Sequence, residues 1–393
     1  MQAWYFSEGA YPYLPDEASF ESVRVNLPNS VYDPVKGADL YHRYLDEWCY
    51  ADELGLNIMT NEHHQTATNL IPAVPLVAAI LARQTRNVRI LILGNPLANR
   101  RQPVRVAEEM AMIDVISRGR LEVGFVRGVP FEVSAVNSNP MRMSDRMWEA
   151  HDLIMKAWTT HDGPFNWEGR YFHHRQVNIW PRPYQQPHPP VWITVGSPSN
   201  AAKVAKYGYT AATFLSGYNT TREFFDGYRK GWKEAGFPGT GSHKLAYAAL
   251  VYVGDTDQEG YDGIAKLKWY NDANKVAPQF RNPPGYFPAA AAGSVLKGAF
   301  GGQASRDGLG RMPPPKTVEG LLEHGFAFGG NPDTVYKQIK KFYETVGGFG
   351  HLLIMGQAGF LEHEATVKGM QRFVTEVWPR LKEDMNEFRV AAE

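Results

Sequence analysis

The length, composition and charge of the chain exclude several classes of protein. It has 393 residues, 44% of them hydrophobic, and its 41 Lys and Arg side chains balance its 41 Asp and Glu side chains. The zero net charge argues against a nucleic-acid partner, which requires a positive surface. The single cysteine, Cys49, excludes an internal disulfide framework and suits a reducing compartment.

No segment predicts export or insertion into a membrane. Residues 1–6 carry no basic region followed by an apolar stretch, so they do not resemble a signal peptide. The longest apolar stretch, 71–82, contains two prolines, and it is shorter than the roughly 20 residues that cross a bilayer. We therefore expect a cytoplasmic protein with no membrane partner.

Eight short apolar segments alternate with segments of helical period. Several are apolar throughout, as strands covered on both faces are. The expected strands are 4–6, 57–60, 88–93, 121–126, 191–195, 211–215, 245–253 and 351–355. This alternation predicts a (β/α)8 TIM barrel. A doubly wound sheet is the competing fold, but the chain contains neither the glycine fingerprint of a dinucleotide-binding domain nor a phosphate loop.

Helix signals lie between these strands. Apolar residues at helical spacing predict a helix over 38–55. Two prolines, each preceded by a polar residue, predict helices that begin at Pro103 and just after Asn331. Ser144 is expected to cap a further helix.

Two segments interrupt the alternation. Residues 160–190 predict a hairpin followed by a Pro-rich approach to the fifth strand. Residues 275–325 are rich in Pro, Gly and Ala, and a loop of this length inside a compact domain is usually a lid or disordered. We expect a single barrel domain over 1–393, with 275–325 as a mobile lid beside the active-site face.

Polar residues follow the second expected strand, at the end where barrel enzymes carry their active sites. His63 can act as an acid or base near neutral pH, and the adjacent carboxylate of Glu62 can tune it. Polar rim residues without a catalytic role explain the same pattern equally well. A zinc site is disfavoured, because the chain lacks an H-E-x-x-H motif and thiol ligands.

Two further residues suit an anion. Arg127 follows the fourth strand, where it can bind an anion bidentately or form a structural ion pair. Ser197 follows the fifth strand and is expected to cap a helix whose first N–H groups can bind a phosphate.

The same segments resemble the bacterial luciferase-like flavin monooxygenase family. The resemblance is carried by residues 61–64 (Asn-Glu-His-His), 93–97, 102–109, 113–128, 186–192 and 330–335. The order and spacing of these motifs cover roughly 1–260 and 326–385.

The resemblance implies that reduced FMN binds at the carboxyl-end rim of the barrel. His63 matches the catalytic histidine of the family. The residues that the resemblance places around the flavin are Asn95, Arg127, Gly196, Ser197 and Asn200. Asn200 stands where luciferases have a threonine, Gly196 replaces a glutamate, and Asn95 is assigned by its position beside the bend of the third strand.

The implied activity is that of a two-component monooxygenase. A separate flavin reductase supplies FMNH2, dioxygen adds to form a flavin hydroperoxide, and one oxygen atom passes to a small organic substrate. An enzyme supplied with reduced flavin needs no nicotinamide site, which agrees with the missing dinucleotide motif. Phe6 and Tyr218 suggest an apolar or aromatic substrate pocket. Because members of the family are often dimers or larger, we expect a homo-oligomer.

Three other functions remain open on the sequence. A deazaflavin-dependent reductase would use the same barrel without dioxygen. A flavin-binding protein that has lost catalysis, or a zinc hydrolase, would also fit a barrel. The Glu-His-His cluster and the long insertion favour the monooxygenase, and no metal is expected.

Overall fold

The computed structural model describes most of the chain. The described residues are 1–16, 19–273, 276, 280, 283, 285, 286 and 315–384. The insertion expected at 275–325 lies largely outside them, so its role as a lid stays a prediction. Within the described part of the chain, no helix has the length and apolar character needed to cross a membrane.

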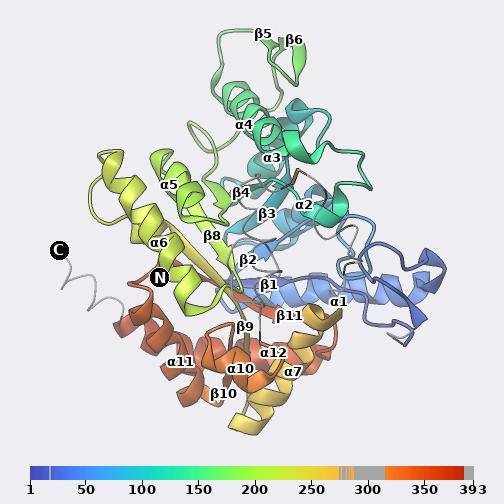
Figure 1. Ribbon diagram of the computed structural model, residues 1–393, viewed down its shortest axis with the longest axis vertical. Helices are drawn as coiled ribbons and strands as arrows, with labels where there is room; N and C mark the ends of the chain where they lie inside the picture. The colour runs from blue at the N-terminus through green and yellow to red at the C-terminus, as the bar shows by residue number, and fades with distance from the viewer. Residues whose placement is uncertain are drawn as a thin grey trace, which may run out of the picture.

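A closed barrel of eight parallel strands lies at the centre of the molecule (Figure 1). In order around the barrel the strands are β1 (Gln2–Ser7), β2 (Asn57–Thr60), β3 (Ile90–Pro96), β4 (Leu121–Val126), β7 (Val191–Thr194), β8 (Thr210–Phe214), β9 (Leu245–Val253) and β11 (His351–Gln357). Pairing of β8 with β9 and of β11 with β1 closes the sheet. The predicted barrel is confirmed, and every predicted strand overlaps an observed one.

The prediction missed a further parallel strand, β10 (Ala327–Gly330). It pairs with residues 250–253 of β9, beyond the residues that pair with β8. Its sequence, Ala-Phe-Gly-Gly, lacks the β-branched residues that strands favour. It is identified as a strand by its pairing with β9, which the sequence does not indicate.

Helices cover the outside of the barrel (Figure 1). They are α1 (Pro34–Glu53), α2 (Val74–Gln84), α3 (Pro103–Ser117), α4 (Met143–Thr159), α5 (Pro198–Lys206), α6 (Gly217–Glu234), α7 (Asp257–Ala273), α10 (Val318–Glu323), α11 (Pro332–Thr345) and α12 (His363–Arg372). The predicted start of α3 at Pro103 is confirmed. Asn331 caps α11 as predicted, because its side chain accepts from the N–H of Thr334 at 3.0 Å.

The start of α4 differs from the prediction. Ser144 does not cap this helix, because α4 begins at Met143 and Ser144 lies in its first turn. A short 3-10 turn, Pro140–Arg142, leads directly into α4. Asn139 caps that turn by accepting from the N–H of Met141 at 3.0 Å. The cap therefore lies one turn earlier than the serine suggests.

An antiparallel hairpin of β5 (Phe165–Glu168) and β6 (His173–Val177) lies within residues 160–190. It extends from the barrel beside α4 (Figure 1). The carboxylate of Glu149, on α4, accepts the backbone N–H groups of Tyr171 and Phe172 at 3.0 Å, which fixes the hairpin to the helix.

The apolar core has two parts, one inside the barrel and one between the strands and the helices. Along β1, Trp4 and Phe6 point into the barrel, whereas Tyr5 faces the helices, as the alternation of a strand requires. The ring of Trp4 packs edge-on against Trp192 with 5.3 Å between centroids. Because side chains fill the interior, the rim is the place for a ligand.

Close packing of β3 against β4 requires a glycine. The register of this pair shifts between Ile92 and Asn95. A Cβ atom on Gly124 would lie 2.5 Å from the carbonyl oxygen of Ile92 and 2.8 Å from the Cα of Leu93. Any side chain at Gly124 would therefore displace the end of β3, where the rim begins.

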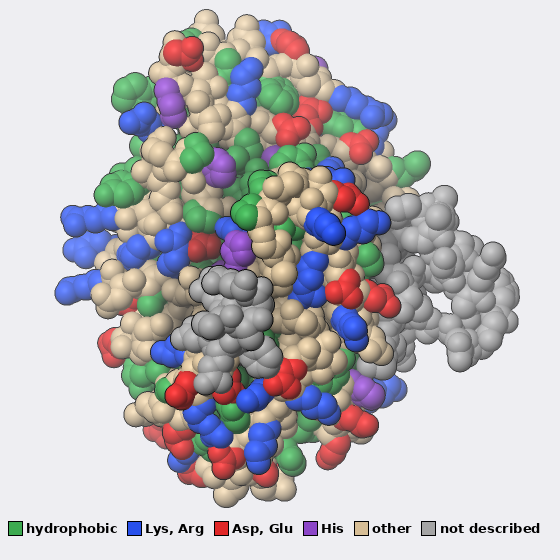
Figure 2. Space-filling model, turned by 90° about the vertical axis from the view of Figure 1, so that its left-hand side faces the viewer, with side chains coloured by type: hydrophobic (Ala, Val, Ile, Leu, Met, Phe, Trp, Pro, Cys, Tyr) green, Lys and Arg blue, Asp and Glu red, His purple; other side chains and the backbone are tan. Residues whose placement is uncertain are grey.

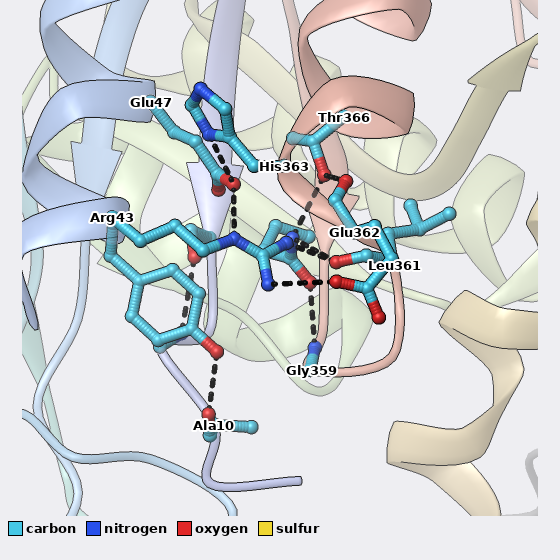
Figure 3. A network of polar contacts seen from close by, with 12 residues as sticks. Ala10, Arg43, Glu47, Gly359, Leu361, Glu362, His363 and Thr366 are labelled. Carbon is cyan, nitrogen blue, oxygen red and sulfur yellow. Dashed lines mark hydrogen bonds and ion pairs between the residues drawn. The ribbon is translucent and has the colours of Figure 1, made fainter. Parts of the chain in front are cut away.

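A network of polar contacts joins α1 to the segment between β11 and α12 (Figure 3). Arg43 lies at its centre, with Nε 2.9 Å from Oε1 of Glu47, and it also donates to the carbonyl of Leu361. His363 contacts Oε1 at 3.4 Å, and the Tyr5 hydroxyl donates to Oε2 at 3.2 Å. Burial raises the pKa of Glu47, so its charge depends on these contacts. The network links the first and last β/α units.

We expect Tyr5→Phe to lower the free energy of unfolding by about 2 kcal/mol, because its hydroxyl donates to a buried carboxylate. Urea denaturation followed by tryptophan fluorescence measures this loss. Tyr44→Phe is the matched control, since its hydroxyl donates to the neutral carbonyl of Ala10 at 2.6 Å. The control should lose about 1 kcal/mol. Equal losses in the two variants would contradict a role for the charge of Glu47.

Charged side chains of both signs cover the side of the molecule that carries α5 and α6. Figure 2 shows Lys and Arg interleaved with Asp and Glu over the lower part of this face. Several of these charges pair across or along the helices, such as Lys206 with Glu234 at 3.0 Å. The distribution agrees with the equal numbers of acidic and basic residues in the chain.

Candidate active site

The carboxyl ends of β2, β4 and β7 bring the main candidate residues to one rim of the barrel. His63 follows β2, Arg127 follows β4 and Ser197 follows β7. β4 and β7 are neighbours that pair directly, so Arg127 and Ser197 leave adjacent strand ends. β3 lies between β2 and β4.

His63 pairs with a carboxylate that the sequence did not identify. Its Nδ1 lies 2.9 Å from Oε1 of Glu132, which also accepts the backbone N–H of His64 at 3.0 Å. Glu132 ends a short turn, Pro130–Glu132, after β4, and its side chain is 2% exposed. Burial alone would raise the pKa of Glu132, but the hydrogen bond and charge of His63 hold it below its usual value.

Glu62, expected to tune His63, contacts other groups. Its two oxygens lie 2.6 and 2.8 Å from Nη2 of Arg100, and Oε1 lies 2.8 Å from Nε2 of His64. Oε2 also accepts the N–H of Val74 at 3.3 Å. The fully buried carboxylate is thus held by three groups, which suits a residue that fixes the loop bearing His63. Arg100 gave no signal in the sequence.

The pKa values at this rim predict how stability varies with pH. The hydrogen bond that His64 donates to Glu62 raises the pKa of His64 above its ordinary value of 6.5. A raised folded-state pKa adds stability that is complete below 6.5 and is lost as pH rises through the higher folded value. We expect the free energy of unfolding to fall as pH rises above about 6.5.

Urea denaturation between about pH 3 and 9 measures this dependence, and His64→Gln should flatten it at alkaline pH. The lowered pKa of Glu132 acts in the opposite direction. It adds stability above about pH 4.3 that is lost as pH falls through the lower folded value. Glu132→Gln should therefore flatten mainly the acidic limb, because Glu132 is only a minor cause of the raised pKa of His64. A larger effect of Glu132→Gln on the alkaline limb than on the acidic limb would contradict the assignment of the two pairs.

Arg127 forms no ion pair with an acidic side chain of the described residues, and it contacts Tyr286. Its guanidinium lies 3.8 Å from the ring centroid of Tyr286, and Nη1 donates to the Tyr286 carbonyl at 3.3 Å. The Tyr286 hydroxyl donates to the carbonyl of Gly128 at 2.7 Å. Both groups that contact the guanidinium are uncharged, so neither forms an ion pair with Arg127.

Ser197 caps α5 as predicted. Its Oγ accepts from the N–H of Asn200 at 3.2 Å and contacts Oγ of Ser199 at 3.1 Å. Gly196 and Asn200 lie in the same turn, at the positive end of the helix dipole. A guanidinium and a helix N-terminus on adjacent strand ends form a donor set that fits a phosphate group.

Asn95 supports the bend of β3. Its side chain is buried, and Nδ2 donates to the carbonyl of Gly124 at 3.2 Å and lies 3.7 Å from Sδ of Met110, on α3. Its Oδ1 has no hydrogen-bond partner among the described residues. The side chain joins β3 to β4 and faces α3.

The two residues expected to line a substrate pocket lie in different layers. Phe6 is inside the barrel, where its ring is 6.3 Å from that of Phe214. Tyr218 packs against Phe342, with 5.0 Å between centroids, in the layer between α6 and α11. The structure does not bring these two residues together.

No group of three or more His, Cys, Asp and Glu side chains within the described ranges could hold a metal ion.

The fold and this rim define a class of protein. The profile of the luciferase-like monooxygenase family matches residues 29–348, so the chain belongs to that family of oxidoreductases. The flavin-dependent trigonelline monooxygenase, oxygenase component, of Acinetobacter baylyi is 30% identical over 174 residues, which cover 43% of this chain and 47% of that protein. The match therefore spans about half of that relative's length. 2,5-Diketocamphane 1,2-monooxygenase 1 of Pseudomonas putida is 23% identical, over 84% of this chain and 91% of that protein.

Solved structures share the barrel. The oxygenating constituent of 3,6-diketocamphane monooxygenase of Pseudomonas putida, in complex with FMN, superposes with a TM-score of 0.70 at 20% identity. It covers 96% of this chain and 97% of its own. An F420-dependent secondary alcohol dehydrogenase superposes with a TM-score of 0.64 at 16% identity, over 96% of this chain and 98% of its own. At these identities the likeness concerns the fold.

Proposed function

We propose that this chain is the oxygenase component of a two-component FMN-dependent monooxygenase. It would take FMNH2 from a separate flavin reductase and use dioxygen to oxygenate a small organic substrate. The observation that carries the proposal is the anion-binding set of Arg127 and the α5 N-terminus, on the same rim as the His63–Glu132 pair. The relatives named as oxygenase component and as monooxygenases support it.

The phosphate of FMN would be held by Arg127 and by the first turn of α5, which Ser197 caps. The N–H groups and the guanidinium supply charge-assisted hydrogen bonds that a phosphate accepts. When bound, the flavin supplies the reduced ring that activates dioxygen. Asn95 would support the bend of β3 beside that ring without contacting it.

His63 would hold or move a proton at Nε2. Its Nδ1 is 2.9 Å from Glu132, whose pKa is lowered, so at neutral pH the carboxylate accepts and Nδ1 carries the proton. In the neutral ring Nε2 is then an acceptor, which can take a proton from a substrate or return one. Glu132 acts as a positioning residue because it fixes this tautomer. Glu62, committed to Arg100 and His64, positions the same loop.

The apolar surface of two helices supports a homo-oligomer. α2 and α3 pack against each other, and both present large apolar side chains to the outside. These exposed residues are Leu76, Ile80, Met112, Val115 and Ile116. Light scattering of the purified chain tests the assembly, and a monomer at micromolar concentration would exclude it.

Anaerobic titration with FMNH2, followed by rapid mixing with dioxygenated buffer, tests the proposed function. We expect saturable binding, and reoxidation of the bound flavin with phases that free FMNH2 does not show. Glu132→Gln should keep the binding but alter the pH dependence of reoxidation.

An F420-dependent enzyme is the second candidate, since such a dehydrogenase shares the barrel. Binding of the reduced deazaflavin without binding of FMNH2 would replace the first proposal with this one.

A further inference from the structure

A cavity lies between the loop that follows β3 and the segment that leads from β4 into α4. Its volume is about 250 Å³, or about eight water volumes. Its walls are formed by residues 98, 99 and 101, residues 136–139, 142, 143 and 146, and Tyr171, which lies between the two strands of the hairpin beside α4. None of the candidate active-site residues described above lines it.

Positive charge and neutral polar groups dominate this cavity. Arg101, Arg142 and Arg146 line it together with Asn99 and Asn139. No acidic side chain is among the described residues of its walls. Three arginines and no acidic residue thus line one small space, in a chain whose net charge is zero.

None of these three arginines forms an ion pair with an acidic side chain of the described residues. Nε of Arg146 donates to the carbonyl of Ala98 at 3.0 Å, and Nη2 donates to the carbonyl of Arg100 at 2.8 Å. Both acceptors are neutral, and burial lowers the pKa of Arg146. The guanidinium groups of Arg101 and Arg142 form no hydrogen bond or ion pair with any residue that the structure describes.

The acidic side chains of α4 that could reach the cavity have other partners. Asp145 lies 3.6 Å from Arg170, on the hairpin. Glu149 accepts backbone N–H groups of residues 170–172. The N-terminus of α4, which has no side-chain cap, adds the positive end of a helix dipole at Arg142 and Met143.

We propose that this cavity binds a compact polyanion, a small organic molecule with two or more oxyanion groups such as a phosphate ester or a tricarboxylate. A bound anion would pair with guanidinium groups that form no ion pair with the described residues. Each guanidinium fork matches the geometry of a carboxylate or a phosphate, and two or three forks call for more than one oxyanion group. The volume admits a molecule larger than a single phosphate ion. The inference does not depend on the proposed monooxygenase activity.

Isothermal titration calorimetry of the full chain with citrate and with pyrophosphate, at constant ionic strength, tests the proposal. We expect saturable binding of at least one probe, and the pair Arg101→Gln/Arg142→Gln should weaken it by at least about tenfold. Both side chains are exposed and pair with none of the described residues, so thermal unfolding without ligand should stay unchanged in this variant. Binding of citrate alone indicates a carboxylate ligand, and binding of pyrophosphate alone indicates a phosphate ester.

Arg127→Gln separates this cavity from the proposed flavin site. The variant should bind the probe as the unmodified chain does, because Arg127 does not line the cavity. The proposal is wrong if Arg127→Gln abolishes binding while Arg101→Gln/Arg142→Gln retains it. Absence of heat with both probes, together with an unchanged melting temperature, also overturns it.

Discussion

Arg127→Gln is expected to weaken FMN binding by about 100-fold, a loss of about 3 kcal/mol. The reason is that glutamine cannot supply the charge or the paired N–H donors that a phosphate accepts from a guanidinium. Arg127→Lys should recover part of the loss, because lysine restores the charge but not the fork. Fluorescence titration of oxidised FMN measures the dissociation constant without requiring a known substrate.

Riboflavin, which lacks the phosphate, is the matched ligand control. Its affinity should be nearly the same for the unmodified chain and for Arg127→Gln. Arg105→Gln is the control variant, since Arg105 is exposed and pairs with Glu109 at 3.0 Å on α3. An equal loss for FMN and riboflavin would mean that Arg127 acts through its contact with Tyr286 and not through the phosphate.

The parts of this protein that the sequence predicted depend on local patterns. Apolar β-branched runs identified the eight barrel strands, and a serine before a proline identified the cap of α5. Arg127 and Ser197 could be proposed from the sequence because both lie directly at strand ends, where barrel enzymes place their functional residues. The prediction that Ser144 caps α4 was wrong. It rested on the local preference for serine at helix starts, but the preceding 3-10 turn leads directly into the helix, which begins before Ser144.

The parts that the sequence missed depend on contacts between distant segments. Glu132 meets His63 across 69 positions, and Arg100 meets Glu62 across 38. Tyr286 reaches Arg127 across 159 positions. No spacing rule links such residues, because the pairing of strands and the course of the loops decide which of them meet. The nearest carboxylate in sequence, Glu62, was therefore assigned to the wrong histidine.

Arg100→Met is expected to lower the free energy of unfolding by about 3 kcal/mol at pH 8, because it leaves the carboxylate of Glu62 buried without its main partner. The value is at the low end of the range for buried pairs, since the Arg100 side chain is 28% exposed. Urea denaturation with tryptophan fluorescence measures the loss. The double variant Glu62→Gln/Arg100→Met should regain much of it, because the remaining amide carries no charge.

The loss in Arg100→Met should also depend on pH. His64 is the other cationic partner of Glu62, and the hydrogen bond between them raises its pKa. Below about pH 6.5 a protonated His64 still offsets the buried charge, whereas above its folded pKa it does not. The destabilisation should therefore be larger at pH 8 than at pH 6. A loss that is the same at both values would mean that His64 does not share the charge of Glu62, and the two histidines of this rim would then act independently.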